Sequence, residues 1–203
     1  MIKLFLLLTS VVLLASCVTA PPIHSLPPNA QQWETHQQNM LALTHWQLRG
    51  KVAMHNGNEG GQADVFWQQT DAQTYEIRLV APLGSGSSVL TANPEQAMLT
   101  LSNGESATAA TVDELLKEIP DWKFPVSGLR FWLLGIASPQ SAVNQMNWDE
   151  QGRLALLEQD GWRIELQNYA PFGDYFLPRK IMMRRLDKNN IDVKLLIREW
   201  TSP

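Results

Sequence analysis

Apolar and polar residues alternate with a period of two through much of the middle of the chain. The alternation runs through residues 45–55, 62–68 and 75–79. It is typical of antiparallel strands that have one apolar and one polar face. The residues expected on the apolar face are Trp46, Leu48, Val52, Met54, Ala63, Val65, Trp67, Tyr75, Ile77 and Leu79. Further strands are predicted at 89–92, 97–102, 154–159, 162–167, 178–186 and 192–200, which gives roughly nine to eleven strands.

Turn-forming residues separate these predicted strands. Asn-Gly, Asp-Gly and similar pairs between two apolar runs favour the tight turns of β-hairpins. Such sequences occur at residues 58–61, 71–72, 103–104, 151–152, 160–161 and 189–190. The chain therefore reads as a meander of antiparallel strands.

Three segments have helical spacing instead. The first is predicted to begin at Asn29 as the N-cap and to end near Thr44, with only a thin apolar stripe. A second covers residues 111–119 and begins with a capping box, and a third covers 129–136 with apolar residues at i, i+3, i+4 and i+7. Many strands and few helices predict a barrel or a strongly curved sheet, with the helices filling or covering its opening. An apolar concave face closed by short helices is suited to hydrophobic ligands.

The N-terminus is typical of a secretory signal. Lys3 precedes an apolar run over residues 4–14, and small residues then lead to Cys17, the only cysteine. The run matches a signal h-region of roughly 7–15 residues and is shorter than the roughly 20 that span a bilayer. Residues 14–17, Leu-Ala-Ser-Cys, resemble the lipobox of bacterial lipoproteins. That resemblance implies that residues 1–16 are removed and that Cys17 carries a diacylglycerol and an N-acyl chain. The alternative is a free or buried cysteine in a soluble domain.

The segment from 17 to 28 is predicted to be a tether. It contains four prolines and few residues that could form a core, so it should be semi-extended. Residues 29–203 show no repeat and no second linker, and we expect them to form one domain. Val18 follows the cysteine where many inner-membrane lipoproteins have aspartate, which favours the outer membrane. A single acyl chain binds a membrane only marginally, whereas several give stable anchoring.

Charge and composition narrow the possible partners. The formal net charge is −4, and the 16 lysines and arginines are scattered, with one small cluster at 184–185. Nucleic-acid binding requires a basic stripe, so we expect no nucleic-acid partner. An acidic protein gains little from anionic headgroups, so the acyl anchor must supply membrane attachment. The eight tryptophans favour a large cavity wall or an interface, and a tryptophan-rich core is the alternative.

We find no motif in the sequence that is typical of catalysis or metal binding. The four histidines form no H-E-x-x-H pair, and residues 84–88, Gly-Ser-Gly-Ser-Ser, lack the G-x-S-x-G order of a catalytic serine turn. We therefore expect no enzyme activity, no metal and no cofactor. The loop at residues 80–86 is more distinctive, because Leu83 stands between Pro82 and Gly84. Leu83 is either an exposed apolar finger or a residue that packs against the sheet.

Several of these segments together resemble the LolB family of outer-membrane lipoprotein receptors in Gram-negative bacteria. The segments are residues 14–17, 32–38, 66–70, 82–85 and 129–135, in the order and spacing of that family. The resemblance implies a mainly β fold with α, an incompletely closed antiparallel barrel of about eleven strands with about three helices over its hydrophobic mouth. It also implies a monomer on the periplasmic face of the outer membrane, lipid-anchored, that binds no cofactor.

The function implied by the resemblance is lipoprotein transfer. Such a receptor accepts acylated lipoproteins from the periplasmic carrier LolA and inserts them into the inner leaflet of the outer membrane. Leu83 matches the family's exposed leucine that acts in membrane insertion. The acyl chains would lie in a cavity lined by Leu48, Val65, Trp67, Ile77, Leu79 and Trp132. The alternatives are a lipoprotein that scaffolds an envelope assembly and a storage binder for one lipid.

Overall fold

The fold is an open, strongly curved antiparallel sheet. The computed structural model describes residues 25–57, 59–82, 86–117, 126–187 and 190–201. Eleven strands form one sheet in the order β6-β5-β4-β3-β2-β1-β13-β12-β9-β8-β7, and β10 and β11 form a separate hairpin. Three helices, α1 to α3, complete the described chain. The sheet is thus a meander whose two halves meet where β1 pairs with β13.

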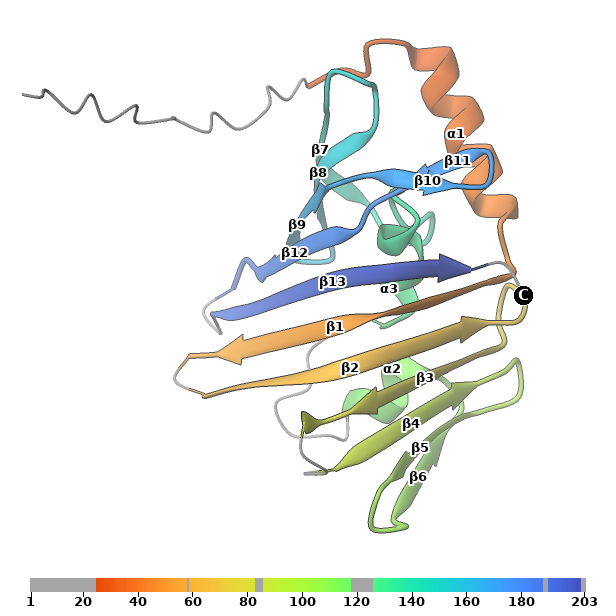
Figure 1. The fold of residues 1–203 in the computed structure, drawn as a ribbon, viewed down its shortest axis with the longest axis vertical. Helices are drawn as coiled ribbons and strands as arrows, with labels where there is room; N and C mark the ends of the chain where they lie inside the picture. Colours follow the sequence, from red (N-terminus) through yellow and green to blue (C-terminus); the bar gives the residue numbers. More distant parts are fainter. Residues whose placement is uncertain (1–24, 58, 83–85, 118–125, 188–189, 202–203) are drawn as a thin grey trace, which may run out of the picture.

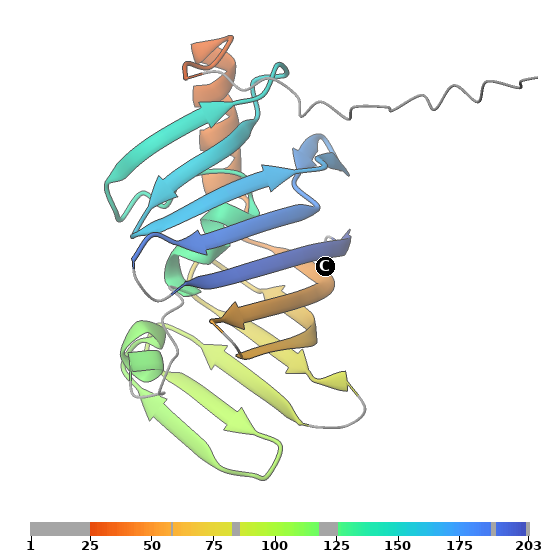
Figure 2. The ribbon, with the colours of Figure 1, turned by 90° about the vertical axis from the view of Figure 1, so that its left-hand side faces the viewer.

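The helices are α1 (Ala30–Ala42), α2 (Val112–Lys117) and α3 (Val126–Leu133). The strands of the first half are β1 (Trp46–Asn56), β2 (Glu59–Gln69), β3 (Tyr75–Val80), β4 (Ser87–Ala92), β5 (Ala97–Leu101) and β6 (Ser106–Ala109). The remaining strands are β7 (Val143–Trp148), β8 (Leu154–Gln159), β9 (Trp162–Gln167), β10 (Ala170–Phe172), β11 (Tyr175–Leu177), β12 (Lys180–Arg185) and β13 (Ile191–Thr201). In Figure 1, α2 and α3 lie behind the sheet, and Figure 2 shows the curvature from the side.

The predicted fold class is confirmed: the protein is mainly β, with an antiparallel sheet that does not close and three described helices. The period-two alternation places its apolar side chains on one face. Leu48, Val65 and Ile77 are buried on three neighbouring strands, whereas the intervening Phe66 and Arg78 are exposed. One continuous core forms between this face and the helices. Burial of that apolar surface is the main force that holds the layers together.

Helix α1 begins as its sequence predicts. The side chain of Asn29 accepts a hydrogen bond from the backbone N–H of Gln32 at 3.1 Å, which caps the first turn. Trp33 and Met40 are the buried residues of the helix, and Trp33 meets the Trp148 ring edge-on at 5.6 Å. Leu41, expected on the apolar stripe, is 42 % exposed. A two-residue contact face of this kind holds α1 near the β7 end of the sheet.

Four strands were missed by the sequence prediction, because each is either only three or four residues long or mostly polar. The short strands β6, β10 and β11 and the polar strand β7 were not expected from the pattern. In addition, residues 59–61 belong to β2 rather than to a turn, since the β1–β2 connection is shorter than predicted. Gly57 takes a positive φ of 62° in that connection, a conformation that suits glycine.

The N-terminal predictions fall mostly outside the described residues. The proposed signal peptide, Cys17 and most of the tether lie in residues 1–24, and Leu83 lies in 83–85. None of the described helices is long and apolar enough to cross a membrane.

Candidate functional site: an apolar cavity in the curved sheet

The inner face of the sheet and helices α2 and α3 enclose an apolar cavity of about 380 Å³. Such a volume lies within the range typical of sites for small ligands. Five of the six side chains predicted to line a cavity do line this one: Leu48, Val65, Trp67, Ile77 and Leu79. They come from β1, β2 and β3, where the cross-strand register places Leu48 opposite Trp67 and Val65 opposite Leu79. The pleat therefore gathers residues of three strands on one surface.

The lining continues beyond the predicted residues. The sequence analysis did not assign these further residues to the site, although several stand at alternating positions of predicted strands. They are Val52, Met54, Gly61, Gln62, Ala63, Ser88, Leu90, Leu99, Leu101, Leu116, Val126, Leu129, Met183, Val193 and Leu195. Only Gln62 and Ser88 among the described lining residues have polar side chains, and none is titratable. A ligand held here by these residues must be bound chiefly through apolar contact.

The cavity reaches the surface at one end of the strands. Met54 and Leu101 line it and are nevertheless 39 % and 40 % exposed. Met54 stands near the end of β1, and Leu101 is the last residue of β5. We call these two residues the rim of the cavity. Exposed apolar side chains at the opening of an apolar cavity form a continuous path from its interior to the surface.

An aromatic cluster lies at the opposite end of β1 and β2 from the rim. The Trp46 ring lies 5.5 Å from Trp67 and 5.3 Å from Trp200, and Trp67 lies 5.5 Å from Tyr75. The Trp67 indole N–H donates to Gln69 at 3.0 Å, so the ring is fixed in place. Burial raises the pKa of Tyr75 to about 12. Of these rings only Trp67 lines the cavity, and the other three pack around it on the side away from the opening.

Trp132, the sixth predicted residue, does not line the cavity. It is fully buried, and its indole N–H donates to Oε1 of Gln159 at 2.9 Å. Helix α3 directs this ring toward β8, whereas Val126 and Leu129 of the same helix line the cavity. The helical spacing predicted the apolar face of α3 correctly, but it does not determine which residues of that face line the cavity. Trp67 is the one described tryptophan in the lining, and the other described tryptophans belong mainly to the core.

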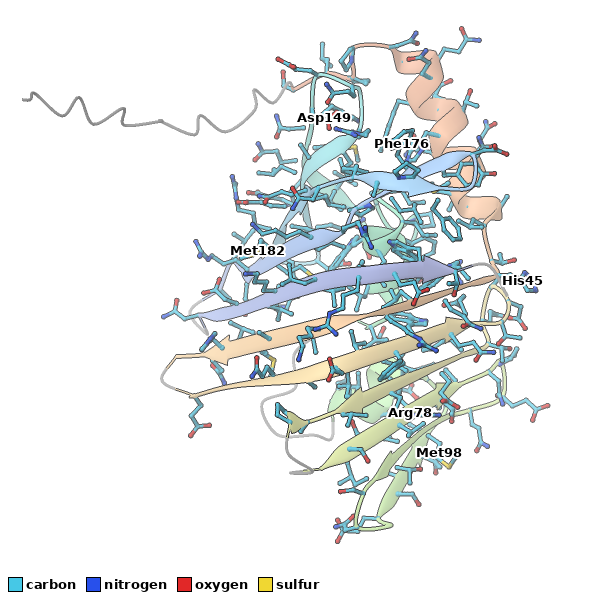
Figure 3. The ribbon with its side chains drawn as sticks, in the orientation of Figure 1. His45, Arg78, Met98, Asp149, Phe176 and Met182 are labelled. Carbon is cyan, nitrogen blue, oxygen red and sulfur yellow. The ribbon has the colours of Figure 1, made fainter. Side chains whose placement is uncertain are left out.

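The outer face of the same sheet is polar. Arg78 stands between the lining residues Ile77 and Leu79, points to the opposite face and is exposed (Figure 3). It pairs with Glu76 at 2.7 Å. Within the described ranges no cluster of three His, Cys, Asp or Glu side chains could hold a metal ion. Among the described residues, the site is thus an apolar cavity whose wall is polar and solvent-exposed on its outer face.

Comparison with known proteins identifies the family. A family model described as outer membrane lipoprotein LolB matches residues 44–200. The chain belongs to the LolB family. Among its relatives, the outer-membrane lipoprotein LolB of Pseudomonas fluorescens is 35% identical over 198 residues, which cover 97% of this chain and 94% of the relative. The LolB of Pseudomonas aeruginosa is 35% identical over 201 residues, covering 98% and 96%.

Solved structures show the same fold at low identity. A LolA superfamily protein from Nitrosomonas europaea matches with a TM-score of 0.56 at 7% identity, covering 86% of this chain and 93% of that one. A putative outer membrane lipoprotein-sorting protein domain from Vibrio parahaemolyticus matches with a TM-score of 0.56 at 9% identity, covering 85% and 90%. As a LolB family member, the protein is a lipid-anchored outer-membrane receptor in lipoprotein localisation and not an enzyme. Its family works in the Lol lipoprotein trafficking pathway.

Proposed function

We propose that the apolar cavity receives the acyl chains of lipoproteins brought by a LolA-type periplasmic carrier and releases them into the inner leaflet of the outer membrane. The observation that carries this proposal is the cavity itself, whose described wall is apolar apart from Gln62 and Ser88. Each methylene removed from water contributes about 0.8 kcal/mol, so acyl chains need such a shield between two membranes. Leu48, Val65, Trp67, Ile77 and Leu79 form part of that shield.

The proposal includes the anchor. Residues 1–16 act as a signal peptide, Cys17 carries a diacylglycerol and an N-acyl chain, and residues 17–28 tether the domain of residues 29–203 to the outer membrane. Three acyl chains suffice for stable attachment, whereas one would not. Leu83 is assigned to membrane insertion during release. The receptor works as a monomer, without any cofactor beyond the lipid on Cys17.

In this scheme the free energy of the acyl chains falls at each transfer step. The receptor binds acyl chains more tightly than the carrier does and less tightly than the bilayer does, so no energy source is needed. Two features of the described cavity suit such an intermediate. Its walls provide apolar contact, and it is open at the end of the strands where the rim residues Met54 and Leu101 are exposed. A scaffold lipoprotein would need a filled core at this place, and no feature of the described residues favours that alternative.

Binding of a tripalmitoyl-cysteine peptide to the full-length lipoprotein in amphipols, without a bilayer that would take up the acyl chains, tests the proposal. We expect saturable binding and a shift in tryptophan emission, because Trp67 stands in the wall. Trp67→Phe should keep binding but lose most of that shift. Leu99→Gln, which places a polar group in the lining, should weaken binding by about tenfold or more, since an amide would be buried without a partner. Leu196→Gln, on the exposed face of β13, is the control. Equal binding by the Leu99 and Leu196 variants, both folded, would refute an acyl-binding role for the cavity.

A further inference from the structure

The outer edge of β6 presents backbone groups that no described strand pairs. β6 is the last strand of the sheet in the described chain and pairs with β5 on one side (Figure 1). The register joins Leu99 to Ala107 and Ala97 to Ala109, and the N–H of Leu101 donates to the carbonyl of Glu105 at 2.9 Å. Hydrogen-bonded pairs recur at every second residue of an antiparallel ladder. The N–H and C=O groups of the alternate residues Ser106 and Thr108 therefore point away from β5.

The two edges of the sheet differ in how open they are to another strand. β7, at the far edge, has register shifts between Val143 and Gln145 and between Asn147 and Trp148, and such irregularities hinder strand addition. The β5–β6 pairing has none. β6 has the sequence Ser-Ala-Thr-Ala, without the proline or charge that commonly blocks an edge, and its first three residues are exposed.

The open edge begins beside the opening of the cavity. Leu101, one of the two rim residues, is bonded through its backbone to Glu105, the residue before β6. From there β6 runs away from the rim toward α2. A chain that leaves the cavity past Leu101 is thus delivered to the start of the unpaired edge. This continuity between cavity and edge indicates what the edge meets.

We infer that the β6 edge binds the N-terminal peptide segment of the acylated cargo as an added strand. The inference rests on the proposed function, since it assigns the polypeptide next to the acyl chains. With the acylated cysteine at the rim, the cargo peptide would run away from it alongside β6 and parallel to it. Strand addition uses backbone hydrogen bonds for affinity, so it tolerates differing side chains. A receptor for many lipoproteins needs this tolerance.

The geometry specifies the contacts. The N–H and C=O groups of Ser106 and Thr108 bond the cargo backbone over about four residues, the length of β6. Ala107 lies opposite Leu99, a lining residue, so the inner face of β6 carries only a small side chain beside the cavity. Every second side chain of the added strand would lie on this face, next to the acyl chains.

Thr108→Pro and Thr108→Val in the full-length lipoprotein test the inference. Proline removes the outward N–H and obstructs the edge but leaves the β5–β6 bonds in place, and edge strands tolerate it there. Valine keeps the N–H and the β-branched shape. Two probes are used with the protein in amphipols, without bilayer lipid: a tripalmitoyl-cysteine octapeptide and a fatty acid without peptide. We expect Thr108→Pro to bind the octapeptide roughly tenfold more weakly than Thr108→Val does, and both to bind the fatty acid equally.

The outcomes separate the inference from the function on which it rests. Equal octapeptide binding by the two folded variants, with fatty-acid binding intact, overturns the added strand but leaves the acyl cavity. Failure of the wild-type protein to bind either probe overturns the proposed function itself. If Thr108→Pro does not fold, the wild-type protein is tested with two octapeptides. One is methylated on the odd-numbered backbone nitrogens and the other on the even-numbered ones, and each pattern is called a phase. The inference expects one phase to bind about tenfold more weakly than the unmethylated peptide, and it fails if both bind equally. Self-association that depends on Thr108, without any effect on cargo, would assign the edge to a second copy instead.

Discussion

At the scale of single residues, Gln159 is a buried polar group with all its hydrogen bonds satisfied. The side chain is 1 % exposed, and its Oε1 accepts from the Trp132 indole and from the backbone N–H of Ser138, both at 2.9 Å. Its Nε2 donates to the carbonyls of Ser138 at 2.8 Å and of Ser141 at 2.9 Å. One amide thus joins β8, helix α3 and the segment that precedes β7. This network fixes the ring of Trp132, which explains why that side chain is directed away from the cavity.

Gln159→Leu should destabilise the protein by at least about 3 kcal/mol. Leucine is similar in size, but it leaves the Trp132 N–H, the Ser138 N–H and two carbonyls buried without partners, and each such group costs about 1–3 kcal/mol. Gln145→Leu is the matched control, because Gln145 is exposed and makes one bond to Asn147 at 2.7 Å. It should change stability by no more than about 0.5 kcal/mol. Denaturant unfolding of both variants checks this, and similar midpoints would mean that the network contributes little.

At the scale of elements, the pairing of β1 with β13 joins the two halves of the meander, and a bulge interrupts it. The register shifts between Arg49 and Gly50. A Cβ atom on Gly50 would overlap the carbonyl oxygen of Leu196 and lie 3.2 Å from Cα of Ile197. Only glycine allows β13 to approach this closely. The bulge increases the local bend of the sheet, and that bend helps to form the concave face.

Gly50→Ala should therefore weaken the junction of the two halves by more than about 2 kcal/mol, because a backbone must move to relieve the overlap. Gly61→Ala is the control: Gly61 lies in the neighbouring strand, and its Cβ would meet nothing within 4 Å. It should stay within about 1 kcal/mol of the wild-type protein. Thermal unfolding monitored by circular dichroism distinguishes the two. A Gly50 variant as stable as the Gly61 variant would show that β13 can shift freely.

How much of the fold the sequence could predict depends on where each strand lies. Strands 154–159 and 162–167 were predicted with the bounds they have, because buried alternation and an Asp-Gly turn define them. Strands β6 and β7 were missed, since an edge strand buries little and its pairing depends on a neighbour distant from its own residues. The same limit applies to the site. Alternation placed Leu48 and Ile77 in the lining, but contacts between elements decided that Trp132 would face Gln159.

At the scale of the whole molecule, both ends of the strands expose apolar side chains, but the cavity opens at only one of them among the described residues. Met54 and Leu101 are exposed at the rim, and Leu186 in the connection from β12 to β13 is 51 % exposed. β3 ends and β4 begins at this end of the strands, and Leu83 stands between these two strands in the sequence. At the other end of the strands, α1 and the β10–β11 hairpin with Phe176 lie close together (Figure 3). Phe176 is 51 % exposed, as much as Leu186, so the opening of the cavity, rather than the amount of exposed apolar surface, is our reason for proposing that the rim faces the lipid.

Leu83→Glu should separate uptake of cargo from its delivery. Leu83 lies outside the described residues, and its role as a membrane-inserting residue is our proposal. Glutamate would remove a favourable partition into the acyl region and add a charge that resists burial there. Transfer from carrier to receptor in solution should persist, whereas transfer from receptor to liposomes should fall at least tenfold. Stability should change by no more than about 0.5 kcal/mol, as for typical surface substitutions.

The matched control for this variant is Leu41→Glu. Leu41 is an exposed leucine, at 42 %, and it lies on α1, away from the rim. The same change of leucine to glutamate there should leave both transfer steps near the wild-type rate, because that surface does not meet the bilayer in this orientation. A loss of delivery in both variants would show that added negative charge repels the liposome from any position. Equal loss of uptake and delivery in Leu83→Glu alone, or marked unfolding of that variant, would make Leu83 a packing residue. Loss of delivery in Leu83→Glu together with normal delivery in Leu41→Glu would support an orientation in which the cavity opening faces the membrane.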